Sequence, residues 1–264
     1  LLVLAMALSG GTPDPPVPTR PTTGPTHTPV PTATMWPAPT EVVPTVPEAT
    51  AVVVPSDTPV PTSPPPPSSV YIEYVLDVSN SMMQPLQGGG EKLAVAVSAL
   101  TQHWQTLGAE PNIGLRVYGH RFGVTDPASC TDTERLAWPA QGQTEDLISR
   151  LSELSARGMS PLAQTLVDAT GDFSPIDERT NALIVIADGG DNCGKDPRQI
   201  ASTHREVGIR YLVYVVGLAV EEAEKEQLDL LAQESGGLYR DAGSEAELIV
   251  ALNDFVQQIL AEEH

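Results

Sequence analysis

The pattern of hydrophobic and polar positions divides the chain near residue 70. From there on, short continuous apolar runs, typical of buried strands, alternate with longer segments whose apolar residues recur at helical spacing. The short runs predict strands at 70–76, 112–119, 135–138, 181–187, 210–218 and 238–240. The longer segments predict helices at 91–107, 144–155, 160–173, 197–207, 221–235 and 244–261. This alternation predicts an α/β fold with a doubly wound, mostly parallel sheet and helices on both faces.

The first quarter of the chain lacks this periodicity. Residues 12–69 are rich in proline and threonine, and most of the 26 prolines lie there. Proline at this density blocks helices and sheet ladders and favours extended polyproline II conformations, so we expect a disordered linker or stalk. Residues 1–11 resemble the apolar core of a secretory signal followed by small residues, and we expect a remnant of such a signal. These features predict an exported protein, at the cell surface, in the cell envelope or secreted, whose folded domain is 70–264.

The charge of the chain narrows the classes of partner. The formal net charge is −20. Residues 1–69 contain four acidic residues and one basic residue, so they carry −3 and the predicted domain carries −17. Such an acidic surface repels nucleic-acid phosphates and anionic lipid head groups, so we expect no nucleic-acid partner. Beyond residues 1–11, no segment approaches the roughly 18 consecutive apolar residues of a membrane span, and we expect no such span.

Polar residues follow two of the predicted strands directly. Asp77, Ser79 and Ser81 come after the first strand, and Asp188 follows the fourth. Open α/β sheets bind their ligands at the carboxyl ends of the strands, so we expect these side chains to lie at one edge of the sheet. Carboxylate and hydroxyl oxygens suit a hard divalent cation such as Mg2+, Mn2+ or Ca2+ better than they suit zinc.

The sequence DVSNS at 77–81 resembles the metal-ion-dependent adhesion site (MIDAS) of von Willebrand factor type A (VWA) domains. Two further pieces of that pattern follow in the family's order, GMSPL at 158–162 and DG at 188–189. The resemblance covers 70–264 and implies a VWA, Rossmann-like fold of the kind found in exported bacterial proteins. It implies a divalent cation, Mg2+ above all, held by Asp77, Ser79, Ser81, Ser160 and Asp188. Ser160 stands where the family more often has threonine.

The function that this resemblance implies is a non-catalytic, metal-dependent protein-binding module of the adhesion type, outside the cytoplasm. The metal would bridge to an Asp or Glu supplied by a protein partner. One alternative is a regulatory or scaffolding subunit of a larger assembly, as VWA domains serve in metal chelatases and with AAA+ ATPases. Another is a metal-dependent hydrolase. Aspartyl-phosphate phosphatases, however, need a second acid two residues after the strand-end aspartate, where this chain has Ser79, and neither G-x-S-x-G nor H-E-x-x-H occurs.

Four further features have simpler interpretations. Cys130 follows the second predicted strand and Cys193 follows the fourth, so both loops should emerge at the same edge, and in an exported protein we expect a disulfide between them. Asp191 is either a carboxylate behind the metal site or a turn residue. His120, without a second histidine or cysteine at ligand spacing, is an ordinary loop histidine. The glycines at 88–90 match no phosphate-binding motif and predict a flexible loop.

Overall fold

The structure is a computed structural model that describes residues 69–108, 111–173 and 179–262. The expected signal remnant at 1–11 and all but the last residue of the expected linker lie outside these residues. The strands are β1 (Val70–Asp77), β2 (Asn112–Tyr118), β3 (Thr133–Ala140), β4 (Thr180–Ala187), β5 (Leu212–Leu218) and β6 (Tyr239–Ala242). The α-helices are α1 (Lys92–Thr106), α2 (Thr144–Leu151), α3 (Leu162–Thr170), α4 (Pro197–Glu206), α5 (Glu222–Ser235) and α6 (Glu245–Ala261). The loops of the described part also contain the 3-10 helices η1 (Asn80–Met83) and η2 (Pro127–Thr131).

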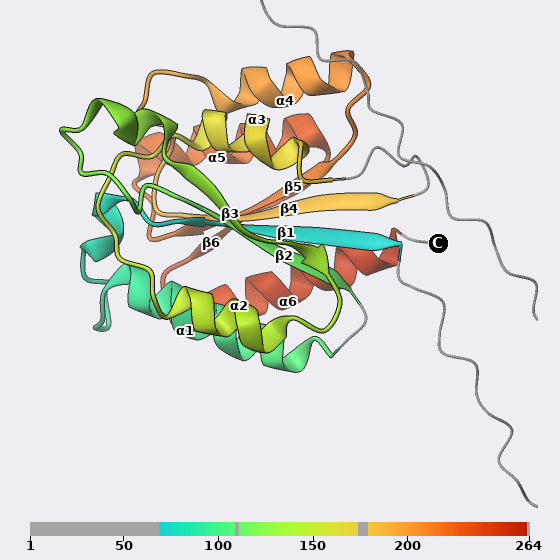
Figure 1. Cartoon of the computed structure of the whole chain (residues 1–264), viewed down its shortest axis with the longest axis horizontal. Helices are drawn as coiled ribbons and strands as arrows, with labels where there is room; N and C mark the ends of the chain where they lie inside the picture. The colour runs from blue at the N-terminus through green and yellow to red at the C-terminus, as the bar shows by residue number, and fades with distance from the viewer. Residues whose placement is uncertain (1–68, 109–110, 174–178, 263–264) are drawn as a thin grey trace, which may run out of the picture. The chain divides into compact units, whose positions relative to one another are not determined.

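The strands of the described residues form a six-stranded sheet in the order β3-β2-β1-β4-β5-β6. Neighbouring strands are parallel except β2 and β3, which are antiparallel. The connection between these two contains only the short helix η2, and so lacks the α-helical crossover that usually joins parallel strands. The predicted doubly wound, mostly parallel α/β fold is confirmed (Figure 1).

Helices cover both faces of the sheet, with α1, α2 and α6 on one face and α3, α4 and α5 on the other (Figure 1). Strand β1 contributes to both cores because successive side chains point to opposite faces. Tyr74 and Leu76 belong to the core under α1 and α6, whereas Val75 belongs to the core under α3 and α5. This burial on both faces explains why β1 is a continuous apolar run in the sequence.

Some predicted boundaries are wrong by a few residues. Helix α2 ends at Leu151 rather than 155, because Ser152 turns its hydroxyl back onto the carbonyl of Ser149 (2.6 Å). Leu154 still packs against the core, so its helical spacing misled the prediction. Strand β3 begins at Thr133 and is longer than predicted. Among the helices that the structure describes, none has the length and apolar character needed to cross a membrane.

The strand order reverses at β1, so the connections on its two sides diverge at the carboxyl edge of the sheet. The chain leaves β1 through α1 to reach β2 on one side, and it returns through α3 to β4 on the other side. Sheets of this kind bind ligands at such a reversal of strand order. Asp77 is the last residue of β1, and Asp188 directly follows β4. The topology therefore places the two aspartates at the position where a ligand is expected.

Charged side chains are buried on the face covered by α3. Arg116 on β2 donates through Nε to Asp172 Oδ2 (2.8 Å), and Arg135 on β3 pairs with the same carboxylate. Glu73 on β1 is fully buried, with Oε1 3.6 Å from Arg116 Nε. Burial raises the pKa of Glu73 well above its usual range, and the neighbouring Asp172 adds to the rise. This cluster ties three strands to the residues after α3.

Candidate metal centre

Asp77 is a fully buried carboxylate at the carboxyl edge of the sheet. The backbone N–H of Ser79 donates to its Oδ1 (2.7 Å), and the Tyr118 hydroxyl donates to its Oδ2 (2.9 Å). Burial raises the pKa of Asp77 to about 7, and the charge of Asp188 adds to the rise, while the hydrogen bonds from Ser79 and Tyr118 oppose it. A cation beside Asp77 would strongly favour its ionised form.

Hydrogen bonds join the serines to the second aspartate. Ser81 Oγ donates to Asp188 Oδ1 (2.7 Å). Because a hydroxyl has only one hydrogen to donate, Ser79 is the donor in the 3.0 Å contact between Ser79 Oγ and Ser81 Oγ. The turn η1 brings these hydroxyls together, and its buried Met82 anchors the turn in the core. Four of the five predicted ligands are therefore connected at this edge.

The fifth predicted ligand, Ser160, lies in a loop that runs beside the end of β1. The backbone N–H of Asn80 donates to the carbonyl of Gly158 (2.8 Å), and the N–H of Gly158 donates to the carbonyl of Gly119 (2.7 Å). Gly119 has φ +76°, and a Cβ there would lie 2.6 Å from a backbone oxygen of the loop, so only glycine allows this approach. Ser160 itself is buried, and its N–H donates to Asn192 Oδ1 (2.7 Å).

The residues at this edge fit a cation held by oxygen ligands. Among residues 69–108, 111–173 and 179–262, no group of three or more His, Cys, Asp or Glu is placed to hold a metal, so a site here depends on the serine hydroxyls. Asp77 and Asp188 are both buried. Asp77 accepts the backbone N–H of Ser79, and the hydroxyl of Ser79 is linked through that of Ser81 to Asp188. Such a set matches the preference of Mg2+, Mn2+ and Ca2+ for carboxylate, hydroxyl and water oxygens.

Comparison with known proteins places the chain in a family. No protein-family model matches the sequence. The chain is 30% identical over 182 residues to the "Uncharacterized protein YwmD" of Bacillus subtilis (strain 168), and the alignment covers 67% of this chain and 80% of YwmD. The chain belongs to the YwmD family.

Solved structures show the fold of this YwmD-family chain. It is similar to a von Willebrand factor type A protein from Catenulispora acidiphila (17% identity, TM-score 0.50, covering 73% of this chain and 42% of that one). It is also similar to the pilus adhesin SpaC from Lactobacillus rhamnosus GG, with 14% identity and a TM-score of 0.56, covering 73% of this chain and 31% of that one. A third similar structure is proximal thread matrix protein 1 from the mussel byssus, with a zinc-occupied MIDAS motif. Its identity to this chain is 18% and its TM-score is 0.52, covering 73% of this chain and 45% of that one. This chain spans less than half of each of these three proteins. The likeness shows the fold alone, and it confirms the VWA fold.

A lysine that the motif does not predict also lies in this VWA domain's carboxyl edge. Lys92 is the first residue of α1 and is buried. Its Nζ donates to Asp188 Oδ2 (2.8 Å), while the other oxygen of that carboxylate accepts from Ser81. The sequence contains a weak signal for a nearby anion, because a cation in the first turn of a helix opposes the helix dipole, but it does not indicate which anion.

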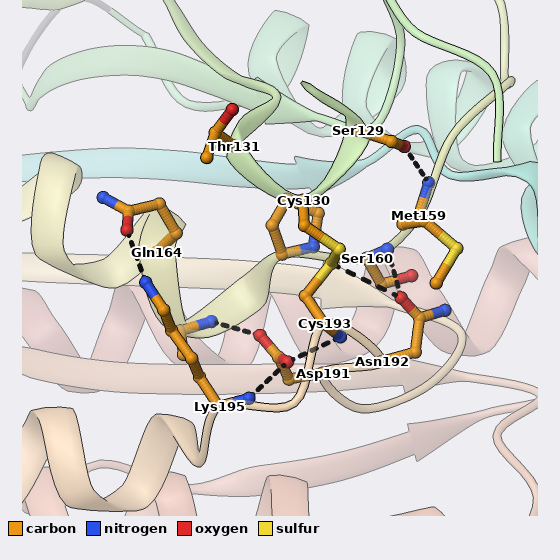
Figure 2. The surroundings of a disulfide bond; sticks show 12 residues. Ser129, Cys130, Thr131, Met159, Ser160, Gln164, Asp191, Asn192, Cys193 and Lys195 are labelled. Carbon is orange, nitrogen blue, oxygen red and sulfur yellow. Dashed lines mark hydrogen bonds between the residues drawn. A yellow bond between two sulfur atoms is a disulfide. The ribbon is translucent and has the colours of Figure 1, made fainter. Parts of the chain in front are cut away.

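Asp191 organises the turn after β4 and the start of α3. Its Oδ2 accepts from the backbone N–H of Ala163 (2.9 Å), and its Oδ1 accepts from the N–H groups of Cys193 (2.9 Å) and Lys195 (3.2 Å), as Figure 2 shows in part. The first turn of α3 is therefore bonded by a residue from a distant loop, and α3 begins at Leu162, two residues later than the predicted start at 160. Of the two interpretations of Asp191, the turn role is confirmed.

The predicted disulfide is present in the YwmD-family structure. Cys130 in η2 is bonded to Cys193 in the loop after β4, with their Cα atoms 5.4 Å apart (Figure 2). Ser129, next to Cys130, accepts the backbone N–H of Met159 (2.7 Å). The bridge thus connects the loop after β2 to the loop after β4, on either side of the loop that carries Ser160.

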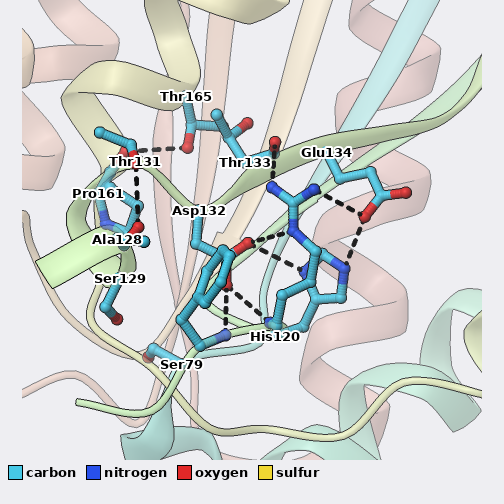
Figure 3. Close-up of polar contacts among 12 residues, drawn as sticks. Ser79, His120, Ala128, Ser129, Thr131, Asp132, Thr133, Glu134, Pro161 and Thr165 are labelled. Atoms are coloured by element: carbon cyan, nitrogen blue, oxygen red, sulfur yellow. Dashed lines mark hydrogen bonds and ion pairs between the residues drawn. The ribbon is translucent and has the colours of Figure 1, made fainter. Parts of the chain in front are cut away.

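His120 is part of a loop network rather than a ligand cluster (Figure 3). Its Nε2 lies 3.0 Å from Glu134 Oε2, and its Nδ1 lies 3.9 Å from Asp132 Oδ1. Asp132 is fully buried and accepts from the N–H groups of Arg121 (2.7 Å) and Phe122 (3.2 Å) and from Arg121 Nε (2.7 Å). Asp132 and Glu134 thus hold His120 and its neighbours within the loop after β2, which agrees with the prediction of an ordinary loop histidine.

Proposed function

We propose that this chain is a non-catalytic protein-binding module whose binding depends on a divalent cation, and that it acts outside the cytoplasm. The observation that carries the proposal is the position of two buried carboxylates at the reversal of strand order in a VWA fold. Asp77 accepts the backbone N–H of Ser79, and Asp188 accepts the hydroxyl of Ser81. Mg2+ is the expected ion, with Mn2+ and Ca2+ as other candidates of the same chemistry. The ligands assigned to it are Asp77, Ser79, Ser81, Ser160 and Asp188.

Neighbouring groups hold these ligands in place. Tyr118 and the backbone of Ser79 fix the Asp77 carboxylate, and Lys92 fixes one oxygen of Asp188. Asn192 accepts the backbone N–H of Ser160 and so fixes the loop that carries this proposed ligand. When bound, the ion supplies a coordination position that a carboxylate from outside can fill. A partner that presents an Asp or Glu side chain is therefore the expected ligand.

Three observations favour binding outside the cytoplasm over the alternatives. The disulfide between Cys130 and Cys193 is of the kind that persists in oxidising compartments. The composition of residues 1–69, an apolar segment at 1–11 followed by a Pro/Thr-rich segment at 12–69 before the domain at 70–264, is typical of an export signal and an extended spacer. Among the similar folds are a pilus adhesin and a byssus matrix protein. A regulatory subunit of an intracellular assembly would instead fractionate with the cytoplasm.

Calorimetric titration of the full chain with MnCl2, after treatment with EDTA and its removal, tests the metal site. Wild type should bind Mn2+ weakly to moderately, because water fills much of the coordination shell of such an ion. Asp77→Ala should show no Mn2+ binding, because it removes one of the two carboxylates assigned to the ion. Asp146→Asn on α2 is the matched control, since Asp146 is exposed and pairs with Arg150 on the same helix. Equal affinities of wild type and Asp77→Ala would overturn the metal assignment.

A second experiment tests partner binding. The tagged full chain is incubated with a cell-surface extract in Mg2+ or in EDTA, and retained proteins are identified by mass spectrometry. We expect a partner that is retained only in Mg2+ and is absent with Asp77→Ala and Asp188→Ala. Retention that is undiminished in EDTA would show that recognition uses another face of the domain.

A further inference from the structure

The position of Lys92 is energetically unusual for a lysine. It is the first residue of α1, where the partial positive charge of the helix dipole disfavours a cation. Its side chain is 9% exposed and that of its partner Asp188 is 1% exposed, so the 2.8 Å ion pair is shielded from water. Burying an ammonium group in this way is favourable only if an anion compensates for its lost hydration. The fold thus places the positive charge of Lys92 next to Asp188, one of the proposed ligands.

A second contact supports this placement. Lys92 Nζ also donates to the carbonyl of Ala219 (3.4 Å), at the carboxyl end of β5. Ala219 has φ +50°, and among the described residues it is the non-glycine residue with a positive φ. A residue with a Cβ adopts this conformation at an energetic cost that the surrounding structure must offset. The β5 turn therefore presents its carbonyl to the same ammonium group that holds Asp188.

The two carboxylate oxygens of Asp188 accept hydrogen bonds from different residues. Oδ2 accepts from Lys92, and Oδ1 accepts from Ser81, on the side of the other proposed ligands. Lys92 is thus not an obstacle that has to leave before Oδ1 or Ser81 can contact an ion. With both aspartates ionised, the two carboxylates and the ammonium carry one net negative charge. A divalent ion would leave one net positive charge, which a single carboxylate neutralises.

We propose that Lys92 is a specificity-determining residue, a fixed cation that lowers the affinity of the site for a divalent ion and reserves the loaded site for a carboxylate ligand. This inference rests on the proposed metal site. Without Lys92, two carboxylates would balance the ion completely, and an incoming carboxylate would add an uncompensated negative charge. With Lys92, the ion binds less tightly alone, and binding of the ion and of the carboxylate favour one another.

The affinity for Mn2+ in the absence of a carboxylate ligand distinguishes a specificity-determining Lys92 from a purely structural ion pair. The experiment uses the full chain as wild type, Lys92→Gln, Lys92→Met and Lys195→Met, with binding measured by calorimetry. Lys92→Gln retains a hydrogen-bond donor for Asp188 and removes the charge, and Lys92→Met keeps an unbranched side chain of similar length. Lys195 is an exposed lysine that bonds to Gln164, so Lys195→Met removes an equal charge outside the ion pair.

Both Lys92 variants should bind Mn2+ about tenfold more tightly than wild type, because one unit charge near a divalent ion is worth roughly that factor even at a solvent-like dielectric constant. Lys195→Met should bind like wild type. The metal-free Lys92 variants should also unfold at lower temperature than wild type, and Mn2+ should raise their midpoints by more than it raises that of wild type, because the ion replaces the lost compensation of Asp188.

Water-proton relaxation measures the carboxylate preference directly, with acetate as the probe. Acetate that displaces water from bound Mn2+ lowers the relaxation enhancement, and this should occur at several-fold lower acetate concentration in wild type than in Lys92→Gln. Mn2+ affinities in both Lys92 variants that equal or fall below wild type would overturn this inference and leave the metal site intact. Absence of Mn2+ binding in all four proteins would overturn the proposed metal site, and this inference with it.

Discussion

The stability of the metal-free protein should fall as pH rises, because Asp77 is buried. An unfolded aspartate has a pKa near 3.8, whereas burial and the charge of Asp188 raise the pKa of folded Asp77 to about 7. Between these values the unfolded state binds fewer protons than the folded state, so the free energy of unfolding decreases with pH. The difference between the two pKa values corresponds to a decrease of about 4 kcal/mol in the free energy of unfolding, and this decrease is complete once the pH exceeds the pKa of the folded state.

The substitution Asp77→Asn isolates this effect because it keeps the shape of the side chain and removes its ionisation. Near pH 4 the variant and wild type should be similarly stable. Near pH 8, in EDTA, the variant should be more stable by up to about 4 kcal/mol. Burial lowers the pKa of His103 to about 4, which gives a contribution of the opposite sign, but His103 is present in both proteins and cancels in the difference.

Urea unfolding of the full chain at several pH values, followed by the fluorescence of buried Trp104, gives the required free energies. Saturating Mn2+ should restore stability to wild type near pH 8, because the ion compensates the ionised carboxylate, and should have little effect on Asp77→Asn. Asp146→Asn is the control for removal of an exposed carboxylate and should follow wild type throughout. The same pH dependence in wild type and Asp77→Asn would refute the assignment of the raised pKa to Asp77.

Three further predictions concern the fold and the site. Replacing Cys130 and Cys193 by serine opens a loop whose ends are 63 residues apart, and urea unfolding should show a loss of about 4 kcal/mol on the chain-entropy model. Arg116→Met removes a buried cation from two acids and should cost about 3 kcal/mol in the same assay, whereas the exposed Arg150→Met should cost less than about 1 kcal/mol. Ser160→Thr should preserve or increase Mn2+ affinity in calorimetry, and Ser160→Ala should reduce it; equal affinities in wild type and Ser160→Ala would contradict a ligand role.

Much of the fold could be predicted from the sequence because each element carries its own pattern. Strand β1 is buried on both faces and so appears as a continuous apolar run. Helix α5 is followed by Gly236, whose left-handed conformation (φ +88°) suits glycine. The strand-end positions of Asp77 and Asp188 also follow from the pattern. Since parallel strands share a carboxyl edge, a local signal was enough to bring these two residues together.

Contacts between distant segments were decided only by the tertiary structure. The N–H of Ala163, in the first turn of α3, is bonded by Asp191, which is close only because the loop after β4 meets the start of this helix. Lys92 lies 96 positions from Asp188, and no periodicity links them. Apolar spacing reports which face of an element is buried, because the tendency to leave water is a property of each side chain by itself. A hydrogen bond or ion pair depends on which two loops meet, and only the packed sheet determines that.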